Sequence, residues 1–265
     1  MFSIVDGVDE IIDRSLGITH IGKAPHYKHI KSCKLLRRNP DSFDGYEILS
    51  KIYDRIEKNY QHPENRVHVS GPSRANWRFE KVPNMDPRNP SEEKILEKTI
   101  AKWASEDWVN QVPTSSGIIN SSSDKLRNID LVHRLSKGVY EFIELKIKSD
   151  TPLYAAFEIT INGLIFLLSR VNYKAQWLKE KPMLAANEII LQTLAPGNFY
   201  SRFKLDWLEK ELNNGLRKIV FEKLQGKLKV RFEFTEFPKE FALPVEKEEL
   251  LEALAGRSVV KWSEQ

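Results

Sequence analysis

The fold prediction starts from residues 128–147, which read NIDLVHRLSKGVYEFIELKI. Two runs of aliphatic, aromatic and β-branched residues, 127–135 and 139–147, flank Ser136-Lys137-Gly138, a three-residue turn that ends in glycine. Runs of this composition joined by a glycine-containing turn are typical of a β-hairpin. We therefore expect two antiparallel strands here.

Charged side chains interrupt the apolar pattern of this hairpin. Side chains alternate between the faces of a strand, so Glu144 and Lys146 share one face while Leu145 and its apolar neighbours point to the other. Turn symmetry pairs residues whose numbers sum to about 274, which places Asp130 opposite Glu144. Carboxylates on directly opposed residues, about 5 Å apart, repel each other unless a cation lies between them. Oxygen ligands of this kind suit Mg²⁺ or Mn²⁺.

A simpler interpretation of the same residues stays open. Glu144 and Lys146 could form an ordinary surface row on an edge strand, with Asp130 capping a turn.

A helix is predicted from Ser91 to about Asp107. Ser91 is a good N-cap, and the acidic residues that follow it suit the positive end of the helix dipole. The helical period places Glu92 near the centre of the apolar stripe, with Glu93 and Glu97 at its edge or outside it. We therefore expect Glu92 to point toward the sheet.

The remaining pattern predicts an α/β protein whose mixed central β-sheet is flanked by helices. Gln111–Lys125 reads as a serine-rich loop, and Pro152 opens the helix that follows the hairpin. The other expected elements are helices at 44–59, 153–173, 200–224 and 245–255 and strands at 187–194 and 228–235. The expected division is an N-terminal extension of a helix plus basic loops (1–88), a core (89–240) and a C-terminal helix and tail (241–265).

Composition bounds the class of protein. The 265 residues include 41 Lys+Arg, 37 Asp+Glu and one Cys, which excludes an internal disulfide and a cysteine-cluster metal site. The acidic N-terminus does not read as a signal peptide, and the most apolar stretch, 153–168, is too short and too polar to span a bilayer. We expect a soluble, cytoplasmic protein without a membrane partner. Its net charge of +4 permits a nucleic-acid partner without requiring one.

Three further groups of residues have both a functional and a structural interpretation. Lys31, Lys34 and Arg37 lie in the densest basic stretch, which could contact phosphates or form a solvated face. Arg74 and Arg78 could contact substrate or belong to an ordinary loop. Glu158 and Asn162, one helical turn apart, could face the acidic site or form a structural pair.

The residues quoted so far resemble those of the PD-(D/E)XK nuclease superfamily, which has a restriction-endonuclease-like core. Asp130 is followed 14 residues later by Glu144-Leu145-Lys146, and the helices beginning at Ser91 and Pro152 match the α-β-β-β-α-β order of that core. The resemblance covers about residues 89–195. Two features depart from the family pattern. Ile129 stands where the motif has proline, and the third strand would have to lie within 143–149 or be absent.

The resemblance implies a role for each residue. Asp130, Glu144 and the Leu145 carbonyl would hold Mg²⁺ or Mn²⁺, Lys146 would orient or deprotonate the attacking water, and Glu92 would support that metal or a second one. The implied activity is hydrolysis of phosphodiester bonds, with DNA favoured over RNA as substrate. The alternative is a nucleic-acid-binding or assembly module that keeps the fold and does not cleave. A homodimer stays open.

Overall fold

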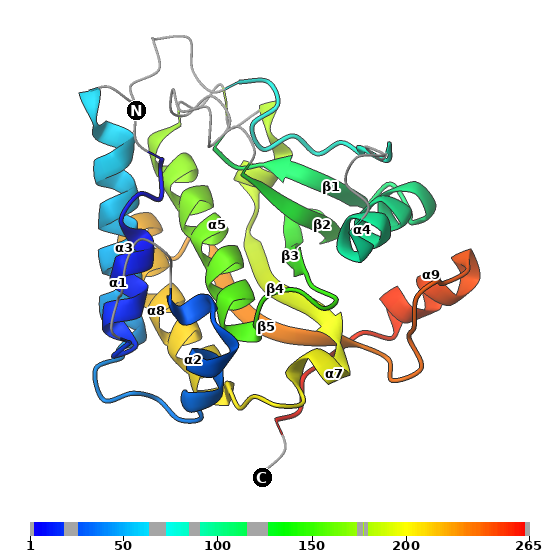
Figure 1. Ribbon diagram of the computed structural model, residues 1–265. Coiled ribbons are helices and arrows are strands. Elements are labelled where there is room, and N and C mark those ends of the chain that lie inside the picture. The colour runs from blue at the N-terminus through cyan, green and yellow to red at the C-terminus, as the bar shows by residue number, and fades with distance from the viewer. Residues whose placement is uncertain are drawn as a thin grey trace.

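A central β-sheet organises the protein (Figure 1). The computed structural model describes residues 3–18, 26–63, 73–84, 91–115, 127–173, 177 and 180–262. Within these residues the sheet has six strands in the order β1-β2-β3-β4-β5-β6. They are β1 (Trp108–Pro113), β2 (Asn128–Ser136), β3 (Val139–Leu145), β4 (Glu188–Pro196), β5 (Lys229–Phe237) and β6 (Ser258–Val259). β1, β2 and β3 are antiparallel, β3, β4 and β5 are parallel, and β6 is antiparallel to β5, so the expected mixed sheet is confirmed.

The predicted hairpin is confirmed, together with its register. Leu131 pairs with Ile143 and Val132 with Phe142, which are the pairs that turn symmetry gives. Gly138 has φ 81°, a left-handed conformation that glycine adopts without steric cost, so the turn closes where the sequence places it.

The third strand lies before the hairpin, as β1, and not within 143–149. The prediction of a loop from Gln111 onward is therefore wrong for residues 111–113. Polar residues hide this strand in the sequence. Asn110 is fully buried, and its polar side chain is satisfied there. It accepts from the Val82 N–H at 2.8 Å and donates to the Glu97 carboxylate at 2.7 Å. The elements then follow one another as α4 (Glu92–Trp103), β1, β2, β3, α5 (Pro152–Asn172) and β4.

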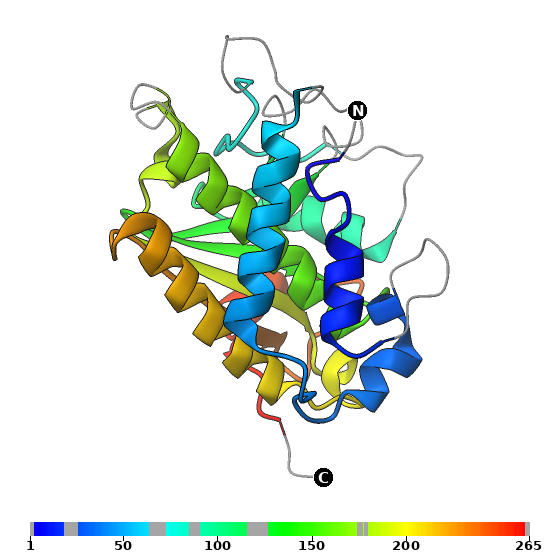
Figure 2. The ribbon, with the colours of Figure 1, turned by 90° about the vertical axis from the view of Figure 1, so that its left-hand side faces the viewer.

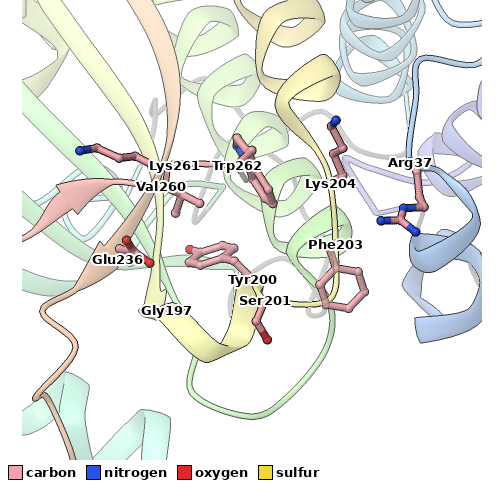
Figure 3. A pocket seen from close by; sticks show the side chains of 10 residues that line it. All are labelled: Arg37, Gly197, Tyr200, Ser201, Phe203, Lys204, Glu236, Val260, Lys261 and Trp262. Carbon is pink, nitrogen blue, oxygen red and sulfur yellow. The ribbon is translucent and has the colours of Figure 1, made fainter. Parts of the chain in front are cut away.

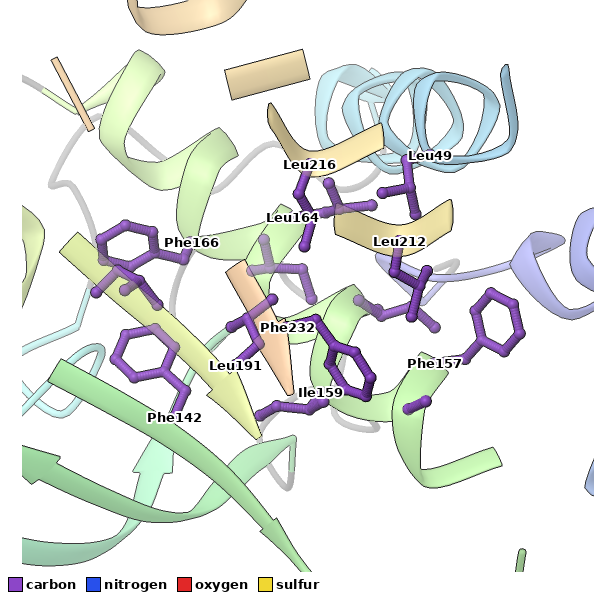
Figure 4. Close-up of a cluster of buried hydrophobic side chains, with 14 of the residues drawn as sticks. Leu49, Phe142, Phe157, Ile159, Leu164, Phe166, Leu191, Leu212, Leu216 and Phe232 are labelled. Carbon is purple, nitrogen blue, oxygen red and sulfur yellow. The ribbon is translucent and has the colours of Figure 1, made fainter. Parts of the chain in front are cut away.

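α5 crosses over from β3 to β4 and packs against both strands. Thr151 caps it by accepting from the Tyr154 N–H, and Pro152 stands in its first turn. The helix is apolar on nearly all sides because it lies between the sheet and the outer helices (Figure 4). By length and composition it is the one described helix that could cross a membrane, but 89% of its apolar window is buried inside the protein. That burial is typical of the core helix of a soluble protein.

The outer layer on this face consists of α1 (Val8–Ser15), α3 (Gly45–Gln61) and α8 (Asp206–Leu224), which Figure 2 shows in front of α5. Ile4 and Ile12 share one apolar cluster with Phe157 and Phe166 of α5. The N-terminal extension therefore packs directly on the core. η1 (His26–Lys28) and α2 (Ile30–Leu35) continue this layer, and η4 (Pro182–Ala185) precedes β4.

The opposite face of the sheet is covered in part by α4 and α9 (Lys247–Ala255). Ile143 and Leu145, the apolar residues of β3 expected to be buried, pack there with Leu96, Ile100 and Leu131. Their burial turns Glu144 and Lys146 toward the α5 face. The short α7 (Gly197–Tyr200) follows β4, at the end of the sheet where the parallel strand β3 also ends.

Candidate active site

The acidic and basic residues of the hairpin meet at the end of β3. Glu144 Oε1 lies 2.9 Å from Lys146 Nζ, and both side chains are buried. Asp130 Oδ2 accepts a hydrogen bond of 3.1 Å from the Leu145 N–H. The structure therefore places Asp130, Glu144, Leu145 and Lys146 at one end of the hairpin.

Asp130 also contacts α4. Lys94 Nζ lies 3.6 Å from Asp130 Oδ1 and 2.5 Å from Glu97 Oε2. Burial and then the nearby charge of Asp130 raise the pKa of Glu97. Lys94 thus holds two carboxylates that would otherwise repel each other.

Lys146 is surrounded by carboxylates. Besides Glu144, it forms ion pairs with Glu158 at 3.0 Å and with Asp150 at 3.5 Å. Burial by itself would lower the pKa of Lys146, but Glu144, Glu158 and Asp130 outweigh it, so the pKa is raised. The side chain is an ammonium at neutral pH.

The pKa of Glu144 is also raised, which for a carboxyl group disfavours the charged form. Its burial, followed by the charges of Asp130 and Glu158, raises its pKa well above the ordinary 4.5, although Lys146 acts in the other direction. A carboxylate in this position gains stability from any further cation that reaches it.

The donors at this point suit a hard divalent cation. Asp130 and Glu144 offer carboxylate oxygens, and the Leu145 carbonyl points to the same side of β3 as the Leu145 N–H that Asp130 holds. Oxygen ligands of this kind fit Mg²⁺ or Mn²⁺. In the described ranges, no three Asp, Glu, His or Cys side chains are grouped closely enough to hold a metal alone. The candidate ligands for a cation are therefore the two carboxylates and the Leu145 carbonyl.

The predicted inward orientation of Glu92 is wrong. Its side chain is 49% exposed and pairs with Lys148 at 2.9 Å, away from Asp130. Glu93 and Glu97 face the sheet instead, one helical turn apart. Glu93 accepts from the Ile147 N–H at 3.0 Å, and Glu97 binds Asn110. The apolar stripe gives the wrong inner face for α4 because part of the true inner face is polar. Glu97 on that face is hydrogen-bonded to Asn110 of β1, a strand that the sequence pattern did not predict.

Of the other predicted site residues, Glu158 reaches the site by its ion pair with Lys146. Asn162 is buried one turn further along α5 and its amide oxygen accepts from Thr114 Oγ1 at 3.2 Å, a contact with the end of β1. Arg74 is exposed and Arg78 is half-buried, while the neighbouring Trp77 is fully buried. Lys31, Lys34 and Arg37 are exposed on and just after α2.

Sequence reasoning missed four residues around the site: Lys28, Lys94, Glu97 and Asp150. Lys28 Nζ lies 3.7 Å from Asp150 Oδ1 and 4.1 Å from the centre of the Tyr154 ring. A signal for two of them exists in the sequence, because Lys94 and Glu97 have the i, i+3 spacing of an ion pair on a helix. For Lys28 and Asp150, far apart in the chain, only the fold brings the side chains together.

Comparisons with known proteins add no family assignment. No family model matches the chain, and no curated protein or solved structure is significantly similar to it. The chemistry of the site therefore carries the functional argument.

Proposed function

We propose that this protein is a metal-dependent nuclease that hydrolyses phosphodiester bonds, with DNA favoured as substrate. The observation that carries the proposal is the convergence of Asp130, Glu144 and Lys146 at one strand end, with the Leu145 backbone between them. The element order α4-β1-β2-β3-α5-β4 also agrees with the α-β-β-β-α-β order of the PD-(D/E)XK superfamily, which the hairpin resembles. On this proposal the protein acts in the cytoplasm, and a homodimer is compatible with it.

A cation bound at this point would lower the pKa of a bound water and offset the charge that develops on the phosphoryl oxygens. Side chains of the protein position the other groups of the site. Glu144 and Glu158 hold the Lys146 ammonium in one place, where it can orient a water molecule or stabilise the negative charge of the transition state. Lys94 and the Leu145 N–H fix the Asp130 carboxylate by two contacts.

The test is nicking of supercoiled plasmid in Mg²⁺ or Mn²⁺. We expect the wild-type protein to nick, and Lys146→Ala and Glu144→Gln to lose at least a hundredfold in rate, because each removes a group that acts on the transition state. Lys148→Ala is the matched control, since this lysine is two residues away and its side chain is 77% exposed. Equal nicking by wild type and Lys146→Ala, or nicking that survives chelation, would overturn the proposal.

A second candidate is a nucleic-acid-binding module that does not cleave. It is favoured by the ion pairs of Lys146 with Glu144 and Glu158, because the Lys146 ammonium already offsets the carboxylate charge that a metal ion would otherwise offset. This candidate predicts salt-sensitive retention of DNA with no nicking in either metal.

A further inference from the structure

We infer that a hollow beside β5 and β6, at the same end of the sheet, binds the sugar–phosphate backbone of the nucleic acid on which the site acts, a few nucleotides from the reacting phosphate. This inference rests on the proposed function. The hollow, of about 80 Å³, is lined by Arg37, Lys204, Lys261 and Ser201, with Tyr200 and Trp262 among its aromatic residues (Figure 3).

The three cations come from separate parts of the chain. Arg37 follows α2, Lys204 lies between α7 and α8, and Lys261 follows β6. Among the described residues, no carboxylate forms an ion pair with any of these three, and the one carboxylate in the lining is that of Glu236. With three cations and one carboxylate in its lining, the hollow carries a net positive charge, which favours an anionic ligand.

The spread of the cations favours a strand over a small ion. In Figure 3 Lys261 lies to one side of Tyr200 and Trp262, and Lys204 and Arg37 lie to the other side. The Lys204 and Lys261 side chains extend in different directions. A single phosphate would be served by donors aimed at one point, whereas a backbone presents one phosphate after another. The half-buried Phe203 and Trp262 add ring faces on which bases can stack.

The sheet register links the hollow to the candidate active site. Thr193 of β4 is the partner of Glu144, and Phe234 of β5 is the partner of Thr193, so all three point to the same face. The Trp262 ring lies 5.2 Å from the Phe234 ring, and Tyr200 Oη donates to the Thr193 carbonyl at 2.9 Å. From β3 to β5 is two strand spacings, about 10 Å. Since stacked nucleotides rise about 3.4 Å each, this distance corresponds to about three nucleotides.

A basic segment runs between the two places. Lys28 contacts Asp150, which in turn contacts Lys146 of the site. From there α2 carries the exposed Lys31 and Lys34 toward Arg37. Trp207 Nε1 donates to the Leu36 carbonyl at 2.8 Å and fixes the chain next to Arg37.

Binding of a fluorescein-labelled single-stranded 20-mer, followed by anisotropy of the full-length protein in EDTA, tests this inference without cleavage. We expect Arg37→Ala, Lys204→Ala and Lys261→Ala each to weaken binding by about five- to tenfold. The slope of log Kd against log salt concentration should fall by about 0.7 for each phosphate that a variant no longer neutralises. Lys229→Ala removes the same charge at the start of β5, the end of that strand opposite to the hollow, and should leave affinity and slope unchanged.

A second measurement separates this inference from the proposed function. Hydrolysis of bis(p-nitrophenyl) phosphate in Mn²⁺ needs the site alone, because this diester is too short to reach the hollow. The three hollow variants should keep this activity while KM for the 20-mer rises. Wild-type cleavage with unchanged oligonucleotide binding in all three variants would overturn the inference and leave the proposed function standing. Binding that depends on the hollow, without cleavage of either substrate, would support the inference and overturn the proposed function. A wild-type protein that binds no oligonucleotide would also overturn the inference.

Discussion

At the scale of single residues, Glu141 shows how a buried charge depends on its partners. Its Oε2 lies 2.7 Å from His133 Nδ1 and 3.1 Å from an Arg257 nitrogen, and Gln192 donates to its Oε1 at 3.0 Å. Burial by itself would raise the pKa of Glu141, but its partners His133 and Arg257 outweigh burial, so the pKa is lowered. The ionised form is therefore stabilised by folding.

This direction sets a pH dependence. A carboxyl whose pKa is lower in the folded state contributes stability above its unfolded pKa and loses it as the pH falls through the folded pKa. Glu141→Gln should lower the free energy of unfolding by about 3 kcal/mol at pH 7, because it leaves the largely buried Arg257 guanidinium without its counter-ion. The difference from wild type should shrink below pH 4.5, the ordinary value, as urea denaturation at several pH values can measure. Glu248→Gln, at an exposed position, is the control. A difference independent of pH would refute the assignment.

The acids of α4 show which residue-scale features can be predicted. Asp130 and Glu144 were predictable because strand alternation and hairpin symmetry are local rules. The exposure of Glu92 and burial of Glu97 were not, because burial of Glu97 depends on Asn110, a partner outside the helix. A stripe of apolar residues gives the inner face of a helix only where that face is wholly apolar.

At the scale of elements, α3 and α8 touch at two glycines. A Cβ added to Gly215 would lie 2.3 Å from the Gly45 carbonyl oxygen, which belongs to a rigid backbone. Gly215→Ala should therefore destabilise the protein by about 2 kcal/mol through overpacking, even though alanine favours a helix by about 1 kcal/mol. Thermal denaturation measures the loss. Lys210→Ala, at an exposed position of the same helix, should leave the melting temperature nearly unchanged. A more stable Gly215→Ala variant would show that the helices are not in contact there.

The strands differ in how far the sequence reveals them. β2, β3, β4 and β5 are long and mostly apolar or alternating, so their pattern predicts them to within about two residues. β1 has six residues, two of them Asn110 and Gln111, and Gln111 has a positive φ of 49°. Such a strand is held by tertiary contacts with α4 and β2, which a local pattern does not record.

At the scale of the whole molecule, the N-terminal extension and the core form one packing unit. Leu49 of α3 lies in the same apolar cluster as Leu164, Leu212 and Leu216 (Figure 4). Removal of residues 1–88 would expose this face of α5 and α8. The truncated chain should therefore lose its cooperative thermal transition and bind a hydrophobic dye that the full chain does not bind. A cooperative melt of the truncated chain would show instead that the extension is a separate addition.

The hydrogen bond from the Leu145 N–H to Asp130 has a consequence for spectroscopy. Most amide protons inside a sheet are held by carbonyls of a neighbouring strand, whereas this one is held by a carboxylate that the proposed chemistry uses. Its chemical shift and its exchange with deuterium would therefore respond to whatever binds Asp130. A single amide resonance is thus a native reporter on the site, and it needs no attached label.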